Sequence, residues 1–489
     1  ISGYSNNALM PNTPTLDSLR ASGITFDQAW SAPSCTPTRA SIMSAKHGNK
    51  TGVLTAPGNL DLSHRSLFKA FDEELDSAYA SALIGKWHIS HPANEDHPEE
   101  HGVSHYAGIL SSSAPAYDGW DKTVNGTTNP TTTYASIEFT NDALMWIGNQ
   151  YKPWLMWLAH IAPHSPIHIP PDSMYSIPAT GTNYRKYIAM IESFDYEVNR
   201  IITSLPDSVR QNTTIFIIGD NGTPTNFLQN YPAGQGKGTI YQGGIRIPMI
   251  VSGKGVTRQG ERESAMVNVL DMHATFLEWA GADLENGIFN SLSFAHLLKG
   301  EAGPVRNFNY SEITSSTLEA YTIRGPQYKL NVYADGSKEL YDLHVDSLES
   351  NNLLLGTLSV AEQAAFDILE EEGAIRQTSW SCQDHIQNGD EEGIDCGGSL
   401  CNPCVAAINK IQKNSIELFP NPTFDVLNGT GAIDLDKTQI INQLGQKMKF
   451  SVLEIESNKW SIGIEDLAPG IYYLKTENGA TFKFEKVAE

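Results

Sequence analysis

Residues 213–222 read TTIFIIGDNG, a short apolar run that ends in glycine and polar residues. An unbroken run of this length is typical of a strand buried on both faces, as in a sheet covered by helices. Such runs alternate with amphipathic segments, for example at 184–205, whose apolar residues lie three and four positions apart. Further runs are SALIG (81–85), PWLMWLAH (153–160) and IPMIVSG (247–253). We therefore predict an α/β fold with a mostly parallel central sheet and helices on both faces.

The composition excludes some classes of protein. The chain has 489 residues, 40% of them hydrophobic, and a formal net charge of −23 with 33 basic residues. A nucleic-acid-binding protein needs a basic face to neutralise phosphates, so we expect no nucleic-acid partner. No apolar run reaches the ~20 residues that a membrane-spanning helix needs, so we expect no transmembrane segment. An anionic substrate would need a local pocket of positive charge.

The pattern changes along the chain and predicts four parts. The α/β pattern fills residues 1–305. Residues 306–378 carry alternating strands with an Asp-Gly turn and then a helix at 359–377, which predicts a small antiparallel α+β subdomain. A cysteine-rich linker module follows at 379–411. Residues 412–489 have short strands with Gly, Asn and Pro turns, which predicts a small β-sandwich-like module.

The five cysteines fall into two groups. Cys382, Cys396, Cys401 and Cys404 lie within 23 residues, whereas Cys35 is alone in the first part of the chain. Four close cysteines form either a zinc site or two disulfides. The surrounding Asp, Gly and Asn residues favour disulfides, which form in an oxidising compartment, so we expect an exported protein.

Titratable residues follow several of the predicted strands. In an open parallel sheet the ligand site lies at the carboxyl ends of the strands, so such residues can meet in space. Asp220 and Asn221 end the first run quoted above and offer oxygen ligands to Ca²⁺ or Mg²⁺, although Asp-Asn-Gly is also a common turn. Lys86 and His88 alternate by two after another strand, so they either share one face of a site or form a solvated strand end.

Other candidate residues lie in loops and at a helix start. Cys35 begins a helix-like stretch near Arg39, where its thiol would be acidified as a nucleophile, although free cysteine is also often a buried structural residue. His164 lies between two prolines, which suits a general acid or a structural histidine. Lys237 sits in a glycine-rich loop that could approach an oxyanion. Together these groups fit the transfer of a tetrahedral oxyanion.

Six short motifs occur in a specific order. They are CTPTR (35–39), GKWH (85–88), APHSP (162–166), GDNG (219–222), GKGTIYQGGIRIP (236–248) and KELYDL (338–343). In this order they resemble the formylglycine-dependent (type I) sulfatases of the alkaline phosphatase superfamily, over roughly residues 8 to 355. The resemblance implies a sulfuric ester hydrolase with the fold of that superfamily.

The resemblance also implies a nucleophile and a metal site. In such sulfatases a separate formylglycine-generating enzyme oxidises the signature cysteine, here Cys35, and the hydrated aldehyde, a gem-diol, attacks sulfur. A thiol could not complete the cycle, because a thiosulfate ester has no second hydroxyl to drive sulfate elimination. Arg39 would orient and stabilise the formylglycine. Asp220, Asn221 and the modified Cys35 would bind Ca²⁺, with Mg²⁺ as the alternative, and Asp220 would take a proton from the diol.

The remaining candidates receive roles in substrate binding and proton transfer. Lys86 and Lys237 would bind the sulfate oxygens. His164 would contact the substrate and protonate the leaving alcohol. His88 would assist the collapse of the sulfated diol.

The chain departs from the family pattern in three places. The family's first strand ends in two adjacent aspartates that complete the metal site, and nothing from Ile1 onward supplies them. We expect this strand to precede Ile1, because it lies at the sheet centre and its loss would expose core; otherwise the chain is inactive. Ser44 and Ala45 replace the usual Thr-Gly of the signature, with Lys46-His47 following where Arg-Tyr is common, and Gln242 replaces a frequent Glu.

The tail resembles the C-terminal sorting domain of type IX secretion in gliding Gram-negative bacteria. The motifs LFPNPT (418–423) and LAPGIYYLK (467–475) carry this resemblance. It implies the type IX secretion machinery as a partner and a secreted or cell-surface location.

The predicted substrate is a sulfated carbohydrate. Bacteria that export sulfatases by this route degrade sulfated polysaccharides, and the acidic chain suits a saline medium, so we expect a marine algal glycan such as ulvan, a carrageenan or a fucan. The His-rich insertion at 91–105 would contact a uronate or a neighbouring sulfate, or be a solvated loop. The alternatives are a phosphonate or phosphate ester hydrolase of the same superfamily and a glycan-binding pseudo-sulfatase.

Overall fold

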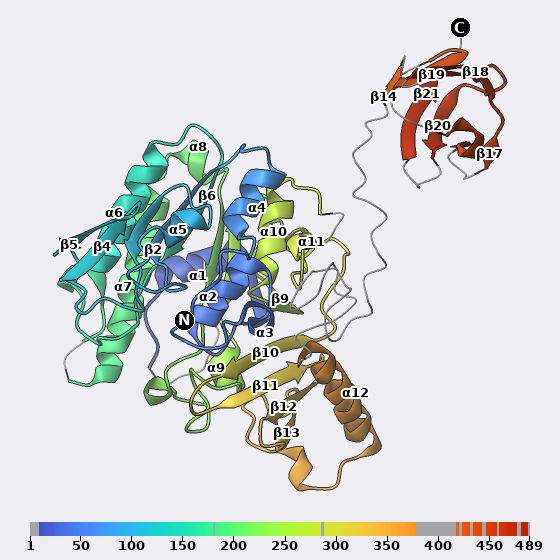
Figure 1. Ribbon diagram of the computed structural model, residues 1–489. Coiled ribbons are helices and arrows are strands. Elements are labelled where there is room, and N and C mark those ends of the chain that lie inside the picture. Colours follow the sequence, from blue (N-terminus) through green and yellow to red (C-terminus); the bar gives the residue numbers. More distant parts are fainter. Residues whose placement is uncertain are drawn as a thin grey trace. The chain divides into compact units, whose positions relative to one another are not determined.

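The chain forms two compact units, Ile1–Pro403 and Cys404–Glu489. The computed structural model describes residues 9–178, 181–284, 288–377, 417–419, 423–430, 434–442, 446–456, 459–476 and 481–487 (Figure 1). The cysteines at 382–404 lie outside the described residues, so their pairing stays a prediction. None of the helices in the described ranges has the length and apolar character required to cross a bilayer.

The first unit contains two large sheets of mixed strand direction. One has the order β7 (Thr214–Ile218), β8 (Met249–Gly253), β1 (Gly23–Trp30), β9 (Glu261–Asn268). The other has the order β5 (Thr127–Thr131), β4 (Trp120–Val124), β3 (Tyr106–Ile109), β2 (Ala80–Lys86), β6 (Trp154–Ala159). The pairs β1–β9, β2–β3 and β2–β6 are parallel, whereas β8, β4 and β5 are antiparallel to their neighbours. The α/β class is confirmed. The sheets contain more antiparallel strand pairs than expected, because an apolar run does not show whether a strand runs parallel or antiparallel to its neighbour.

Helices cover both faces of these strands (Figure 1). One face packs against α1 (Pro14–Ala21), α6 (Ala135–Gly148) and α7 (Asn183–Ser204). The other packs against α2 (Cys35–Ser44), α4 (Leu67–Glu74) and α10 (Asp271–Ala280). Shorter helices are α3 (Gly48–Thr51), α5 (His97–Glu100), α8 (Asp207–Arg210), α9 (Gln242–Ile245) and α11 (Ala295–Lys299). The amphipathic stretch predicted at 184–205 is α7, which begins after Thr182, whose side chain accepts from Arg185 N.

A smaller antiparallel sheet closes the first unit. Its strands β10 (Asn309–Thr314), β11 (Glu319–Arg324), β12 (Tyr328–Tyr333) and β13 (Lys338–Asp342) pair in sequence order. The turn between β12 and β13 uses Gly336 at φ +85°, which glycine adopts without strain. The helix α12 (Val360–Gln377) packs Leu369 against Ile323 and Leu330 of the sheet. This is the antiparallel α+β subdomain that the sequence predicted.

The described residues of the second unit form two four-stranded antiparallel sheets. One has the order β14 (Glu417–Phe419), β15 (Val426–Thr430), β19 (Lys459–Gly463), β18 (Ser451–Glu456), and the other β17 (Lys447–Met448), β16 (Gln439–Asn442), β20 (Gly470–Lys475), β21 (Thr481–Lys486). Both sheets contribute to one core, in which Leu427 and Ile462 of the first meet Ile440, Leu474 and Phe484 of the second. The predicted β-sandwich-like module is confirmed.

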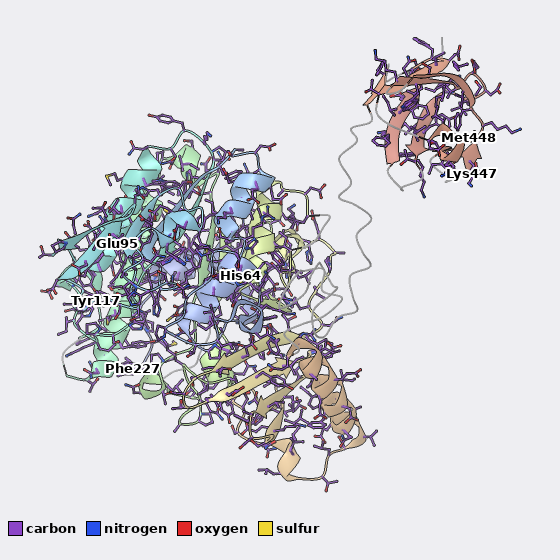
Figure 2. All side chains as sticks on the ribbon, in the orientation of Figure 1. His64, Glu95, Tyr117, Phe227, Lys447 and Met448 are labelled. Atoms are coloured by element: carbon purple, nitrogen blue, oxygen red, sulfur yellow. The ribbon has the colours of Figure 1, made fainter. Side chains whose placement is uncertain are left out.

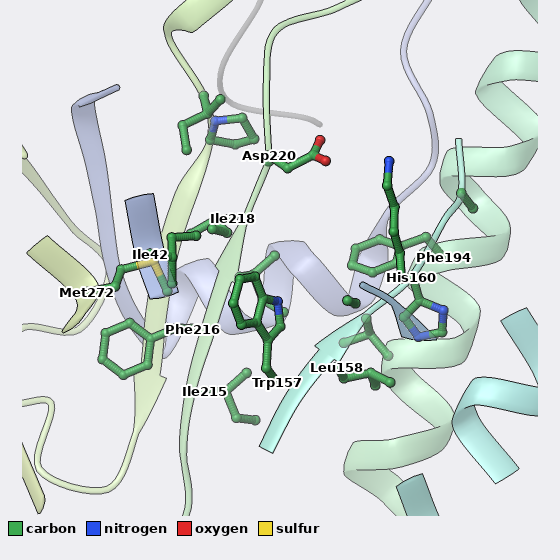
Figure 3. Close-up of a pocket in the computed structure, with 18 of the residues that line it drawn as sticks. Ile42, Trp157, Leu158, His160, Phe194, Ile215, Phe216, Ile218, Asp220 and Met272 are labelled. Carbon is green, nitrogen blue, oxygen red and sulfur yellow. The ribbon is translucent and has the colours of Figure 1, made fainter. Parts of the chain in front are cut away.

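A cavity separates the two large sheets of the first unit. Among the described strands, β6 pairs only with β2 and β7 only with β8, so each has one edge without a partner. The cavity between these edges has a volume of about 2030 Å³. Figure 3 shows Trp157 and Leu158 of β6 and Ile215 and Phe216 of β7 lining it, with Asp220 near one end. All five residues of β7 are only half-buried.

Candidate active site

The candidate active site starts at the first residue of α2. Cys35 is 3% exposed and follows Ser34, whose extended backbone (φ −146°, ψ 165°) marks the helix start. The Cys35 Sγ atom lies 3.3 Å from Nδ1 of His88, and Thr36 Oγ1 lies 3.2 Å from the same nitrogen. The first N–H groups of a helix have no partner within the helix and carry partial positive charge. This position therefore favours negative charge on the residue that occupies it.

Arg39 links three elements of the site. It is 5% exposed, its Nη1 donates to the Lys86 carbonyl oxygen at 2.6 Å, and its Nη2 lies 3.8 Å from Asp220 Oδ2. The guanidinium carbon also lies 5.7 Å from the centre of the Trp157 ring. One side chain thus joins α2 to the ends of β2 and β7.

Lys86 and His88 enter the site from the end of β2. They are 2% and 7% exposed. His88 has a φ of +53°, a conformation that is uncommon outside glycine and concentrates at functional sites. Burial, then the charges of Lys86 and Arg39, lower the pKa of His88 to about 3, so its imidazole is neutral at neutral pH. Burial also lowers the pKa of Lys86.

Asp220 and Asn221 follow the last residues of β7. Burial alone would raise the pKa of Asp220. The positive charges of Lys86, Arg39 and Lys237 outweigh burial and hold that pKa below its usual value, so the carboxyl is ionised. Asn221 Nδ2 donates to the next carbonyl oxygen at 3.0 Å, whereas its Oδ1 is buried without a hydrogen-bond partner among the described residues. A cation would satisfy an unpaired acceptor beside a carboxylate.

Close backbone packing fixes the loop that carries Lys237. Gly222 N donates to Gly244 O at 2.8 Å, and a Cβ on Gly222 would lie 1.9 Å from a carbonyl oxygen of the facing segment, so only glycine fits. Gly238 N donates to Pro33 O at 2.8 Å. The half-buried Lys237 is thereby held beside the start of α2.

His164 lies in the loop after β6. Its Nδ1 is 3.0 Å from the Ser165 carbonyl oxygen, so Nδ1 donates the proton of the neutral ring and Nε2 is left for another partner. Burial, then the charge of Lys86, lowers the pKa of His164, and Lys237 acts in the same direction. The imidazole therefore lies within electrostatic reach of both lysines.

The structure brings together every residue that the sequence singled out for catalysis, substrate binding or metal binding. These residues are Cys35, Arg39, Lys86, His88, His164, Asp220, Asn221 and Lys237. Three cations surround a single carboxylate, which makes one end of the cavity positive in a chain of net charge −23. Ser34 Oγ and Arg39 Nε are also buried without partners among the described residues. Such a site can bind an anion and, at Asp220, a cation.

The His-rich insertion at 91–105 is partly a structural element. His97 and His101 are 2% and 0% exposed, and Trp87 Nε1 donates to His97 Nδ1 at 3.1 Å. The Nε2 atoms of both histidines lie within 3.3 Å of Leu60 O. The expectations of a substrate contact and of a solvated loop are both wrong for these two residues. Their spacing of four, which places both on one side of a helical turn, was the signal in the sequence.

Two further residues were not assigned a role from the sequence. Thr36 shares the His88 nitrogen with the thiol, and its position beside the cysteine was the only hint of this. Gln242 is 3% exposed and its Oε1 accepts a hydrogen bond from Trp30 Nε1 at 3.3 Å. Gln242 is therefore a packing residue rather than part of the charged site.

Within the described ranges, no three His, Cys, Asp or Glu side chains are arranged to bind a metal ion. Asp220 and Asn221 supply two side-chain oxygen ligands, whereas Ca²⁺ takes about six to eight. The metal-binding role of this pair therefore stays a prediction.

The sequence matches three known families. Residues 4–282 match the sulfatase family, residues 235–365 match the C-terminal region of N-sulphoglucosamine sulphohydrolase, and residues 417–488 match the secretion system C-terminal sorting domain. The first match covers more than half of the chain, and the chain belongs to the sulfatase family. The sorting domain identifies a secreted or cell-surface protein.

Curated relatives share about a quarter of their residues with this chain. Arylsulfatase J of Mus musculus is 26% identical over 312 residues, which are 58% of this chain and 51% of the relative. N-acetylgalactosamine-6-sulfatase of Homo sapiens is 26% identical over 314 residues, 55% of this chain and 57% of the relative. The chain thus spans about half the length of the curated relatives it matches.

Solved structures of sulfatases have the same fold. Ps i-CgsB in complex with k-i-k-neocarrahexaose has a TM-score of 0.66 at 22% identity, over 77% of this chain and 88% of that chain. The PsFucS1 sulfatase from Pseudoalteromonas sp. has a TM-score of 0.61 at 18% identity, over 76% of this chain and 87% of that chain. At these identities the likeness establishes the fold alone.

Proposed function

We propose that this protein hydrolyses sulfate esters of a sulfated polysaccharide or oligosaccharide. The observation that carries the proposal is the Cys35 thiol at the start of α2, 3.3 Å from His88 and beside Arg39 and Lys86. A sulfate ester is a tetrahedral anion, and fixed cations in a buried site stabilise the charge that develops on its oxygens. Membership of the sulfatase family supports the same reaction.

Cys35 is the proposed nucleophile position after oxidation by a formylglycine-generating enzyme. The hydrated aldehyde supplies a hydroxyl that attacks sulfur. Asp220, which is ionised, accepts the proton of that hydroxyl, and Arg39 keeps both groups in place. His88 is neutral and its Nδ1 faces position 35, so it can take the proton that must leave when sulfate departs.

Lys86, Lys237 and His164 are the proposed substrate-binding residues. The two ammonium groups bind sulfate oxygens, and His164 Nε2 protonates the leaving alcohol. The two lysines lower the pKa of His164 in the free protein. A bound sulfate would counter their charge and let His164 hold the proton that it must donate.

We also propose Ca²⁺ as the cofactor, with Mg²⁺ as the alternative. Asp220, Asn221 and the modified residue at 35 would hold it, and the unpaired, buried Oδ1 of Asn221 fits this role. The cation would polarise the sulfate and make the attacking hydroxyl more acidic. Because Ca²⁺ takes more ligands than these residues offer, additional oxygen ligands are required.

The open edges of β6 and β7 support a further strand, joined to the chain ahead of Ile1. Each edge leaves backbone N–H and C=O groups facing an apolar cavity, and one extended strand between them would pair both. Both strands end at the site, so a parallel strand would also end there and could supply the missing acidic ligands. Met10 lines the cavity, so a chain leaving this strand would have a short path to α1.

An extended chain tests this strand directly. We expect the protein that includes the residues encoded upstream of Ile1 to unfold at a higher temperature than residues 1–489, and to be stabilised further by Ca²⁺. An unchanged midpoint would contradict the strand. In this proposal residues 1–305 form the catalytic domain, 306–378 its subdomain, 379–411 a linker and 412–489 the sorting domain.

A marine algal glycan such as a carrageenan, a fucan or ulvan is the proposed substrate class. One structure with this fold supports it, since Ps i-CgsB was solved in complex with k-i-k-neocarrahexaose. The sorting domain supports a partner in the type IX secretion machinery and action outside the cell. The measurement is sulfate release from a panel of algal glycans and host glycosaminoglycans.

Two other functions are separated by simple assays. A phosphate or phosphonate ester hydrolase would turn over an aryl phosphate faster than the matching aryl sulfate. A glycan-binding pseudo-sulfatase would bind the glycan and release no sulfate even with formylglycine at position 35.

The central experiment is co-expression with a formylglycine-generating enzyme. Mass spectrometry of the Cys35 peptide should then show the loss of sulfur and the gain of an aldehyde, and the protein should release sulfate. The Cys35→Ala variant is the control for contaminating sulfatases. A modified peptide without hydrolysis of any sulfate ester would overturn the proposed function.

A further inference from the structure

The loop that carries His164 has few backbone donors of its own. Its sequence, APHSPIHIP at 162–170, contains three prolines, which lack N–H groups. One turn bond holds its start, where His164 N donates to Ile161 O at 2.7 Å. The carbonyl groups that follow therefore depend on side-chain donors.

Tyr117 supplies one of these donors. Its hydroxyl donates to the His164 carbonyl oxygen at 2.9 Å, and the tyrosine, labelled in Figure 2, is 3% exposed. Burial raises the pKa of Tyr117, so the hydroxyl stays protonated and remains a donor. The Tyr117 backbone is itself fixed, because Ala135 N, at the start of α6, donates to Tyr117 O at 2.7 Å.

His168 supplies the second donor. Its Nδ1 lies 2.8 Å from the Pro166 carbonyl oxygen, so Nδ1 donates and Nε2 is the acceptor in the neutral ring. The Tyr134 hydroxyl lies 2.9 Å from that Nε2 and donates to it. The ring centres of His168 and Tyr117 are 4.2 Å apart, so the two donors pack against each other.

We propose that Tyr117 is a positioning residue for His164, with His168 as its support. The inference rests on the proposed function, in which His164 protonates the leaving alcohol. Tyr117 holds the backbone of His164 and His168 holds the backbone two residues on, so the direction of Nε2 is set by residues that touch neither sulfate nor metal. A proton donor displaced by about 1 Å can lose up to about 100-fold in rate.

The test compares substrates whose leaving groups differ in basicity, because a general acid speeds the reaction only where the leaving oxygen is basic enough to need a proton. We expect Tyr117→Phe to lower kcat about tenfold on an alkyl or sugar sulfate and less than about twofold on 4-nitrophenyl sulfate, with KM nearly unchanged. Equal losses on both substrates, or a loss confined to KM, would overturn the proposal. The wild-type rate on 4-nitrophenyl sulfate shows separately whether the proposed function holds.

A matched control exists in the sorting domain. Tyr472 is 6% exposed and its hydroxyl donates to the Ala468 carbonyl oxygen at 2.8 Å, the same kind of bond. Tyr472→Phe should leave both substrates unaffected. His168→Asn, which cannot reproduce both bonds of the ring, should show the leaving-group pattern of Tyr117→Phe.

A readout without turnover completes the test. The ¹⁵N shifts of the His164 ring report its tautomer and surroundings in the absence of substrate. We expect them to change in Tyr117→Phe and to stay as in wild type in Tyr472→Phe. Unchanged shifts in Tyr117→Phe would contradict the proposal even if no sulfate ester were hydrolysed.

Discussion

Two groups of charged residues in the first unit differ in how their charges are balanced. In the site cluster, defined as Arg39, Lys86, Lys237 and Asp220, three cations share one carboxylate, and the nearest ion pair spans 3.8 Å. In the junction cluster, defined as Lys329 and Glu349, one cation meets one carboxylate and both are fully buried.

The bonds around the two clusters differ in the same way. Lys329 Nζ donates to Glu349 and to the Ile240 carbonyl oxygen at 2.8 Å, and Glu349 also accepts from Gln242 N. Neither Lys86 nor Lys237 makes a salt bridge with the described residues. Unpaired buried charge costs stability unless a ligand offsets it, so the site cluster is the one that indicates a ligand. The junction cluster instead connects the loop at Ile240 to the C-terminal subdomain.

The largest effect is expected at position 35. Cys35→Ala removes the cysteine of the CTPTR motif, which is the proposed formylglycine precursor, and we expect sulfate ester turnover to fall at least about 10⁴-fold. Its thermal midpoint should stay close to that of wild type, since a small side chain replaces a small one. Turnover of 4-nitrophenyl sulfate by the co-expressed protein measures the change. Residual activity above a hundredth of wild type would remove Cys35 from the mechanism.

The same substitution in the two clusters sharpens the comparison. Lys86→Met removes a cation that would bind sulfate, so we expect kcat/KM to fall about 10²- to 10³-fold. The free energy of unfolding should stay equal or rise, because the substitution removes a buried positive charge that has no ligand to balance it in the free protein. A substantial loss of stability in Lys86→Met would mean that Lys86 is a structural residue.

Lys329→Met is the counterpart in the junction cluster. It leaves Glu349 buried without its cation, and we expect a loss of about 4 kcal/mol in the free energy of unfolding. Activity of the molecules that remain folded should be near wild type. The double variant Lys329→Met, Glu349→Leu should recover most of the loss, because no unpaired charge remains. Denaturant unfolding measures the stability of wild type, the single variant and the double variant. An unchanged stability in Lys329→Met would contradict the view that Lys329 balances the buried charge of Glu349.

Glu312 provides a third case, a buried carboxyl with neutral donors. Asn49 N and the Tyr310 hydroxyl each donate to it at 2.7 Å, and burial raises the pKa of Glu312 to about 7. Between pH 4.5 and 7 the folded chain retains a proton that the unfolded chain has released, so stability falls as the pH rises. Titration of Glu312 should lower the free energy of unfolding by up to about 3 kcal/mol between pH 4.5 and 7.

Unfolding experiments at pH 4.5, 6 and 7.5 test the Glu312 effect. Glu312→Gln keeps a neutral side chain of the same size, so its stability should vary less with pH than that of wild type. Parallel pH curves for the two proteins would show that Glu312 does not titrate in this range.

Much of the site could be predicted from the sequence because its residues lie in short motifs at the ends of apolar runs. Asp220 and Lys86 follow strands that the apolar pattern revealed, and the helix start at Cys35 follows from the residues around it. The hydrogen bonds by which Tyr117 and His168 hold the backbone of the His164 loop could not be predicted. Tyr117 is 47 residues away from His164 in the sequence, and nothing in its surroundings marks its hydroxyl as a donor to that loop.

The sequence by itself determined the α/β class, the identity of the residues that meet at the site and the sorting domain, since each depends on local patterns of residue type. Only the tertiary structure decided strand direction, the burial of His97 and His101, and the balance of charge in the two clusters. It also revealed the cavity between β6 and β7. These properties depend on which segments pack together, and packing partners that are distant in the chain leave no mark in the local sequence.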